Sequence, residues 1–281
     1  MRITLLANRD VHAAVALNLL QPSLVDHEVT LFLSESVGRP RPGYVAPEGL
    51  QQLKFLEGDL FTKIIAPLAE RQPTEGRFLT FRELGRHFGR AARVLHNPNK
   101  GSGLEQLTES RPDLVVSIRY GRILRDAAIR VPRLGVLNLH SGLLPRYQGI
   151  LTTLHSLIED QGEVGCTLHR IDSAAIDAGP VVGRATVPVD RRRSLFRHVQ
   201  QLYPAGCRLI ADAIDALSAG REPSTAAQVQ SEQVYYGLPE PEHFEALQCK
   251  GFGVWHGEDV EEVYRSFLVD PASRDKYDRI A

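Results

Sequence analysis

The sequence has few cysteines and no long apolar run. Its three cysteines, Cys166, Cys207 and Cys249, are far apart and include no Cys-x-x-Cys pair. Neither a disulfide framework nor a cysteine zinc site is therefore expected. The apolar run at residues 3–7 ends at Asn8 and is too short for a signal-peptide core or a membrane span. We therefore expect a cytoplasmic protein without a membrane partner.

An excess of charge of one sign is also lacking. The 33 basic and 34 acidic residues leave a formal net charge of −1 with histidines neutral. A protein with this balance has no overall field that recruits nucleic acid or an anionic membrane. We expect no nucleic-acid partner, which disfavours a tRNA substrate.

Two common cofactor patterns are missing. Residues 7–12, Ala-Asn-Arg-Asp-Val-His, contain no Gly-x-Gly-x-x-Gly, the turn that lets a backbone approach a dinucleotide pyrophosphate. A nicotinamide enzyme is thus disfavoured. The histidines His140, His155 and His169 do not have the short spacing of metal ligands. We expect no metal site.

The apolar pattern predicts an α/β fold. A strand at residues 3–7, a helix at 11–20 with Asp10 as N-cap, and a strand at 29–33 form a β-α-β opening. The 281 residues, 43% of them hydrophobic, can bury a substantial core. We predict a Rossmann-like, doubly wound, mostly parallel sheet over residues 1–220. Residues 221–281 are predicted to form a small C-terminal extension that packs on this domain, because they retain several aromatic residues.

Further elements follow from apolar spacing and from turn residues. Helices are expected at residues 49–70, 80–88, 194–202 and 207–217, and strands at 92–95, 112–117 and 136–139.

Three polar residues are the strongest functional signal. Asn138 and His140 lie two positions apart on the strand that follows Gly135, so they share a face near its carboxyl end, where ligands bind in open α/β sheets. Asp177 lies in a loop closed by Gly179 and Pro180. A carboxamide and an imidazole can stabilise an oxyanion and transfer a proton, and a carboxylate can orient the imidazole.

These residues resemble a known family. Asn138-x-His140, the run Ser-Gly-Leu-Leu-Pro-Arg-Tyr-Gln-Gly at 141–149 and the loop at 177–180 are similar to the signature of the folate-dependent formyltransferases. Residues 112–124 match as well, and residues 165–172 are similar to the family's strand before the catalytic aspartate; the matches occur in the family's order. The resemblance implies a formyltransferase fold, with residues 1–220 as the catalytic domain. It also implies Asn138, His140 and Asp177 as catalytic residues and 10-formyltetrahydrofolate as formyl donor.

The resemblance further implies a site for the pterin ring of the folate. Its members lie in one loop after the strand at 112–117 and in another before Asp177. They are Tyr120, Gly121, Arg122, Ile123, Leu124, Asp172, Ser173, Ala174, Ala175 and Ile176.

Within the family, two missing features favour a small acceptor. The first turn lacks the Gly/Ser-rich phosphate loop of the glycinamide ribonucleotide enzyme, and the last hundred residues lack the basic barrel of the methionyl-tRNA enzyme. We expect an amine or hydroxylamine of a small metabolite, either an amino-sugar nucleotide or a hydroxyornithine-like compound of siderophore assembly in secondary metabolism. A homodimer is compatible with an apolar face on a C-terminal helix. Two alternatives stay open: a formyltetrahydrofolate hydrolase, and a non-catalytic folate- or nucleotide-binding module.

Overall fold

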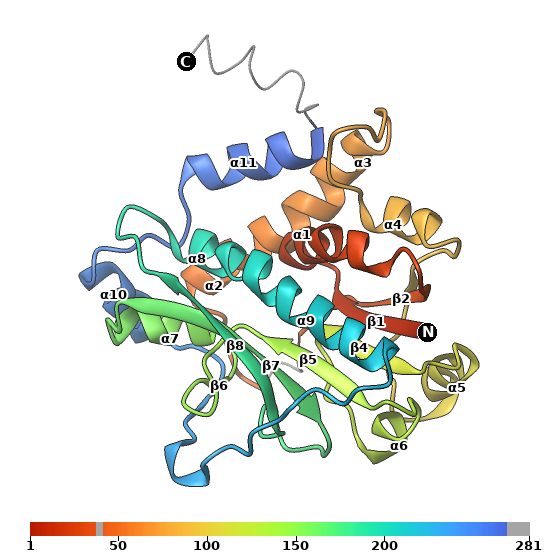
Figure 1. Cartoon of the computed structure of the whole chain (residues 1–281). Coiled ribbons are helices and arrows are strands. Elements are labelled where there is room, and N and C mark those ends of the chain that lie inside the picture. Colours follow the sequence, from red (N-terminus) through yellow and green to blue (C-terminus); the bar gives the residue numbers. More distant parts are fainter. Residues whose placement is uncertain (38–41, 269–281) are drawn as a thin grey trace.

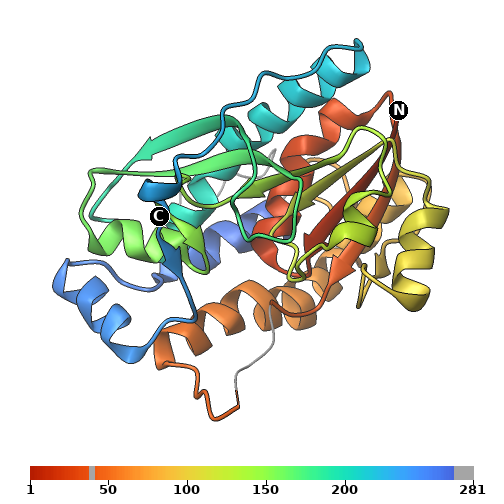
Figure 2. The ribbon, with the colours of Figure 1, turned by 90° about the horizontal axis from the view of Figure 1, so that it is seen from below.

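The computed structural model describes residues 1–37 and 42–268. A mixed, mostly parallel sheet forms its centre, with helices on both faces (Figures 1 and 2). The strand order is β3-β2-β1-β4-β5-β7-β8, in which β7 and β8 run antiparallel to their neighbours. The predicted α/β class and doubly wound sheet are confirmed.

The strands of this sheet are β1 Arg2–Asn8, β2 Glu28–Ser34, β3 Arg93–Val94, β4 Leu114–Ile118, β5 Val136–His140, β7 Glu163–Ile171 and β8 Val181–Pro188. A separate two-stranded sheet consists of β6 (Gln148–Gly149) and β9 (Tyr235–Tyr236). The helices are α1 Val11–Leu20, α2 Glu48–Lys54, α3 Ala66–Ala69, α4 Phe81–His87, α5 Gly101–Glu109, α6 Asp126–Ile129, α7 Thr152–Ile158, α8 Leu195–Gln201, α9 Tyr203–Ser218, α10 Pro241–Cys249 and α11 Gly257–Leu268.

Side-chain capping accounts for several helix starts. The Asp10 carboxylate accepts the Ala13 N–H at 2.8 Å, so the predicted N-cap of α1 is confirmed. Thr80 and Glu83 form a capping box at the start of α4. Ser194 caps α8 and also donates to the Asp259 carboxylate at 2.5 Å, which ties α8 to α11.

The predicted helix over residues 49–70 is interrupted. It consists of α2, a π-helix at Phe55–Ile65 and α3. Helices α5 and α7 and strand β8 were not predicted from the apolar spacing. Strand β8 is an edge strand with mostly part-exposed side chains, and α5 begins with Gly-Ser-Gly, which are weak helix formers. A close tertiary contact explains one of these glycines, because a Cβ at Gly103 of α5 would lie 1.9 Å from the Asn97 carbonyl oxygen.

The sheet separates two apolar cores. The larger core lies under α1 and α9 and takes Leu137 and Leu139 from β5. The smaller one takes Val136 of the same strand, together with side chains from α5 and α6. Because side chains alternate along a strand, Asn138 and His140 point to the face of the smaller core. Beyond Val136, this face of β5 is polar.

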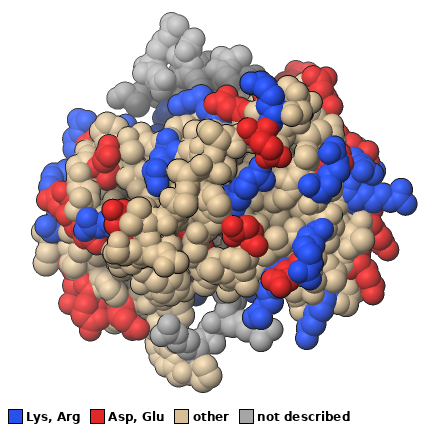
Figure 3. Space-filling view, turned by 60° about the horizontal axis from the view of Figure 1, so that its bottom comes forward, with Lys and Arg blue, Asp and Glu red and all other residues tan. Residues whose placement is uncertain are grey.

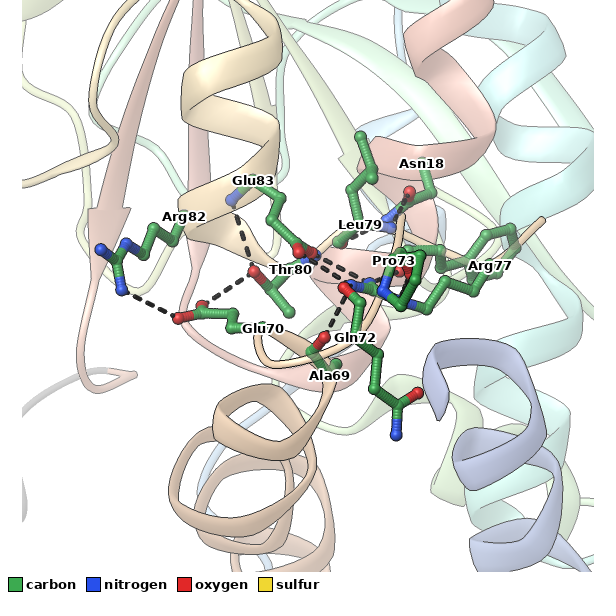
Figure 4. Close-up of polar contacts among 11 residues, drawn as sticks. Asn18, Ala69, Glu70, Gln72, Pro73, Arg77, Leu79, Thr80, Arg82 and Glu83 are labelled. Carbon is green, nitrogen blue, oxygen red and sulfur yellow. Dashed lines mark hydrogen bonds and ion pairs between the residues drawn. The ribbon is translucent and has the colours of Figure 1, made fainter. Parts of the chain in front are cut away.

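A buried arginine fixes the connection between α3 and α4 (Figure 4). The Arg77 guanidinium donates to both carboxylate oxygens of Glu83, at 3.0 and 2.8 Å, and to the carbonyls of Ala69, Pro73 and Phe78. Only 2% of the Arg77 side chain and 5% of the Glu83 side chain is exposed. The loop is therefore held by a charge pair whose donors are also satisfied by the backbone.

The C-terminal segment lies against several parts of the first 220 residues. Helix α10 contacts α7 and α2, and α11 contacts α3 and the π-helix. The proposed boundary at residue 220 stays a prediction, and residues 269–281 of the predicted extension lie outside the described residues. Across residues 1–37 and 42–268, no helix has the length and apolar character needed to cross a membrane.

Candidate active site

The three predicted catalytic residues lie together on the smaller-core face of the sheet. Asn138 and His140 come from β5, and Asp177 comes from the connection between β7 and β8. The Asp177 carboxylate is 3.4 Å from the Nδ1 atom of His140. Asp177 is also 3.4 Å from His169, which contacts Asn138. His169 thus links Asn138 to Asp177, and Asp177 in turn contacts His140.

The His140 ring lies between two oxygen acceptors. Its Nε2 is 2.6 Å from the Tyr147 carbonyl oxygen, and because a carbonyl only accepts, Nε2 carries a hydrogen. Its Nδ1 faces the Asp177 carboxylate. A doubly protonated ring satisfies both contacts, and such a ring can stabilise a developing oxyanion and then give up a proton.

His169 is the site residue that the sequence analysis missed. It stands opposite Asn138 in the antiparallel β5–β7 pair. Its Nδ1 lies 2.9 Å from the Arg170 carbonyl oxygen and therefore donates. When the ring is neutral, Nε2 accepts the Asn138 amide N–H at 3.0 Å; when the ring is protonated, Nε2 carries a hydrogen and faces the Asp177 carboxylate 3.4 Å away. Alternation along residues 165–172 places the polar side chains of Thr167 and His169 on one face of the strand. The sequence did not show which strand pairs with this one, so it did not show that His169 meets Asn138.

Asp177 is a buried carboxylate with several donors around it. Burial alone would raise the pKa of Asp177, but His140, the hydrogen bond from His169 and the Gly149 N–H hold it at about 2. The Gly149 N–H lies 3.0 Å from the carboxylate. Asp177 is therefore ionised at neutral pH and can orient both histidines.

Two glycines allow these groups to approach closely. A Cβ at Gly142 would lie 2.6 Å from the Tyr147 carbonyl oxygen and 2.7 Å from Nε2 of His140. A Cβ at Gly179 would lie 1.9 Å from the Arg170 carbonyl oxygen. These positions require glycine because any side chain would push backbone or ring atoms away from the site.

The predicted pterin residues occupy two loops at the border of the smaller core. In the first loop, Leu124 is buried in that core and Tyr120 packs against it. The Gly121 N–H is already bonded to the Ser34 hydroxyl at 2.9 Å, so this donor is not free for a ligand. Arg122 donates to the Ser36 hydroxyl at 3.0 Å, and Ile123 is 50% exposed.

The second loop, residues 172–176, is exposed throughout. It follows Ile171, which packs against the smaller core. Its last residue, Ile176, has 37% of its surface exposed. The fold therefore brings both loops to one face of the sheet.

The switch point of the sheet, between β1 and β4, is filled by ion pairs. Arg119 follows β4 and donates to Asp10 at 2.9 Å and to Glu57 at 2.5 Å. Burial would raise the pKa of Glu57, but Arg119 and His12 hold it at about 2. Ligands of doubly wound folds bind at this point. Here two carboxylates and a guanidinium line it.

Comparison with known structures defines the class of fold. A sugar N-formyltransferase from Shewanella has a TM-score of 0.53 at 16% identity, over 88% of this chain and 79% of that one. A 4-N formyltransferase from Francisella tularensis has a TM-score of 0.55 at 15% identity, over 87% and 78%. An N-formyltransferase from Helicobacter canadensis has a TM-score of 0.54 at 14% identity, over 95% and 81%. The architecture is the formyltransferase fold.

Sequence comparison agrees with this class of fold. Residues 90–214, less than half of the chain, match the family model described as formyl transferase, a family of one-carbon transferases. The methionyl-tRNA formyltransferase of Kosmotoga olearia is 28% identical over 139 residues, 50% of this chain and 44% of that protein. The methionyl-tRNA formyltransferase of Trichlorobacter lovleyi is 33% identical over 140 residues, which are again 50% of this chain and 44% of that protein. These matches span less than half of the relatives' length.

Proposed function

We propose that this protein transfers a formyl group from 10-formyltetrahydrofolate to an amine or hydroxylamine of a small metabolite. The observation that carries the proposal is the connected set of Asn138, His169, Asp177 and His140 on one face of the sheet. An amide, two imidazoles and an ionised carboxylate can stabilise negative charge on a formyl oxygen and move one proton.

The residues have distinct roles in the proposed reaction. The acceptor nitrogen forms a bond to the formyl carbon, and charge builds on the formyl oxygen. The second amide N–H of Asn138 donates to that oxygen, and such a preorganised donor contributes about 3 to 4 kcal/mol. Protonated His140, whose two N–H groups face Tyr147 and Asp177, stabilises the same charge through its own positive charge. The carbon–N10 bond then breaks, and the proton lost by the amine passes to N10 of the leaving tetrahydrofolate. Asp177 orients His140 and supports this proton transfer.

A folate donor is supported by ligands of structurally similar proteins. The Helicobacter canadensis N-formyltransferase was solved with folinic acid and dTDP-3-aminofucose. The sugar 3N-formyltransferase WlaRD was solved with dTDP and 5-N-formyl-THF. In this chain we assign the pterin to the space between residues 120–124 and 172–176. Each loop presents one partly exposed isoleucine, Ile123 or Ile176, that can cover a flat ring.

A small acceptor is supported by the switch point and by the surface charge. Asp10 already occupies the N-terminus of α1, so an acceptor phosphate placed there would meet a carboxylate. Acidic and basic side chains are interspersed over the face in Figure 3, which gives nucleic acid no continuous basic surface on that face. These observations favour an amino-sugar nucleotide or hydroxyornithine-like acceptor over a purine precursor.

A second candidate acceptor is methionyl-tRNA. It is favoured by the relatives from Kosmotoga olearia and Trichlorobacter lovleyi, which are methionyl-tRNA formyltransferases. Water is a third acceptor that the same residues can serve, and it would make the protein a formyltetrahydrofolate hydrolase.

One screen distinguishes these functions. The protein is incubated with 10-formyltetrahydrofolate and amino-sugar nucleotides, hydroxyornithine, free amino acids or methionyl-tRNA, and products are analysed by mass spectrometry. We expect one formyl group to be gained by a small amine. Modification of the tRNA alone would select the second candidate, and rapid formate release without acceptor would select the hydrolase. Tight folate binding without turnover on any acceptor would contradict an enzymatic role.

A further inference from the structure

Asp177 has a backbone conformation that its surroundings must maintain. Its φ is +52°, in the left-handed region that costs a residue with a Cβ about 1 kcal/mol or more. Such a conformation persists where neighbouring groups hold it in place. The groups that contact this backbone therefore bear on the position of the proposed catalytic carboxylate.

The first such group is Gln228, far along the chain from the family match. Its side-chain Nε2 donates to the carbonyl oxygens of Asp177 at 2.8 Å and of Gly179 at 2.7 Å. Next to this contact, Ala226 and Val181 exchange two backbone hydrogen bonds, at 2.8 and 2.9 Å. One amide thus bridges both sides of the Asp177 turn and is itself anchored to the start of β8.

The segment at residues 226–236, which contains Gln228, also contacts the neighbours of Asp177 through strand β9. Strand β9 pairs with β6, with the Gln148 N–H donating to the Val234 carbonyl and the Ile150 N–H to the Tyr236 carbonyl, both at 2.9 Å. Between these two bonds lies Gly149, whose N–H donates to the Asp177 carboxylate. The Gly149 donor is therefore fixed by the strand pairing on either side of it.

The far end of this segment is anchored as well. The Tyr236 hydroxyl donates to Glu159 at 2.7 Å, and its ring stacks on His155 with centroids 4.0 Å apart. Burial and the nearby His243 lower the pKa of His155 to about 4, so the stacked ring is neutral at pH 7. Both contacts tie Tyr236 to α7 and its end.

We propose that residues 226–236, here called the strap, position the Asp177 carboxylate for formyl transfer, with Gln228 as the main positioning residue. The inference rests on the proposed function. It assigns a catalytic task to a segment outside the family match at residues 90–214. The strap holds the Asp177 backbone through Gln228 and its carboxylate through Gly149.

The test compares Gln228→Ala with Gln248→Ala, an exposed glutamine of α10 outside the strap. Loss of two neutral hydrogen bonds is expected to lower kcat for formyl transfer about tenfold to a hundredfold. The KM for the donor should stay within about twofold, because the folate contacts are not changed. Gln228→Glu keeps the size of the side chain but directs an acceptor at two carbonyls, so it should lose at least as much activity. Wild-type kcat in both Gln228 variants would overturn the proposal.

A double-mutant cycle separates positioning from general destabilisation. When Asp177 is already Asn, adding Gln228→Ala should cause no further fall in kcat, because both changes act on one carboxylate. Fully additive losses would contradict the proposal.

A readout that needs no turnover distinguishes failure of the strap from failure of the proposed function. The ring 15N chemical shifts of His140 and His169, measured at fixed pH, should change in Gln228→Ala and stay unchanged in Gln248→Ala. If wild-type protein formylates no acceptor, these shifts still decide whether Gln228 positions Asp177. Identical shifts in wild type and Gln228→Ala would overturn the inference.

Discussion

His169 lies directly across the β5–β7 pair from Asn138, with its Nε2 3.0 Å from the amide nitrogen of that residue. The same imidazole is 3.4 Å from the Asp177 carboxylate. One ring therefore sets the orientation of the amide and links it to the carboxylate. In the proposed reaction His169 is a positioning residue for the group that meets the formyl oxygen.

Replacing His169 should lower turnover without unfolding the protein. His169→Ala removes the acceptor that orients Asn138, and we expect kcat for formyl transfer to fall about tenfold to a hundredfold. His169→Gln retains an acceptor oxygen and should lose less. Steady-state kinetics with circular dichroism as a folding check measure both. Equal activity of His169→Ala and wild type would show that Asn138 needs no such partner.

Removing the groups proposed to stabilise the oxyanion should have larger effects. Asn138→Ala or His140→Ala should each reduce kcat by about a hundredfold to a thousandfold, as expected when one preorganised donor or charge is lost. His87→Ala is the matched control, because His87 is exposed and bonds only to the side chain of Gln21 among the described residues. Near-normal transfer by both site variants would refute the assigned roles.

Gly142 offers a test of how closely His140 must be held. In Gly142→Ala the new Cβ meets the Tyr147 carbonyl and the His140 ring at 2.6 and 2.7 Å, so one of them must move. We expect a loss of kcat about as large as that of His140→Ala. Gly58→Ala is the control, because its Cβ would meet no atom within 4 Å. If kcat of Gly142→Ala equals that of Gly58→Ala, the close approach has no catalytic importance.

The lowered pKa of Asp177 predicts a stability change in acid. Its pKa falls from an ordinary 3.8 to about 2 on folding. The folded state thus binds this proton more weakly than the unfolded chain, and the stabilisation is present above about pH 4 and lost as the pH falls towards 2. The contribution is about 2 kcal/mol.

Urea unfolding at about pH 7 and about pH 3 measures this contribution. Asp177→Asn cannot titrate, so the fall in its free energy of unfolding between the two conditions should be smaller than in wild type by about 1 kcal/mol, since part of the stabilisation remains at about pH 3. Equal falls in both proteins would mean that Asp177 is not held as an ion by the two histidines.

The buried pair Arg77–Glu83 predicts a large effect on stability. Arg77→Met leaves the Glu83 carboxylate buried without its partner and frees several carbonyls (Figure 4). The free energy of unfolding should fall by about 3 to 5 kcal/mol. Lys63→Ala is the control: it breaks an exposed pair with Asp59, whose side chains are 70% and 54% exposed, and should change stability by less than about 1 kcal/mol. A loss of less than about 1 kcal/mol in both variants would contradict a stabilising role for the buried Arg77–Glu83 pair.

Local sequence was enough to predict much of the fold. The spacing of apolar residues predicted β1, α1 and β2, and Asp10 was identified as the N-cap because its side chain reaches a backbone N–H only three residues away. Asn138 and His140 were predicted to share a face because alternation along one strand needs no partner. Each of these features depends on neighbours in the chain.

What the sequence by itself determined was the class of fold, the family pattern and the three polar residues of the site. The tertiary structure alone decided that β7 pairs antiparallel with β5, which places His169 opposite Asn138. It also decided that Gln228 and Gly149 meet Asp177. The physical reason is that strand register and loop closure depend on contacts between distant segments, whose free energies no local pattern encodes.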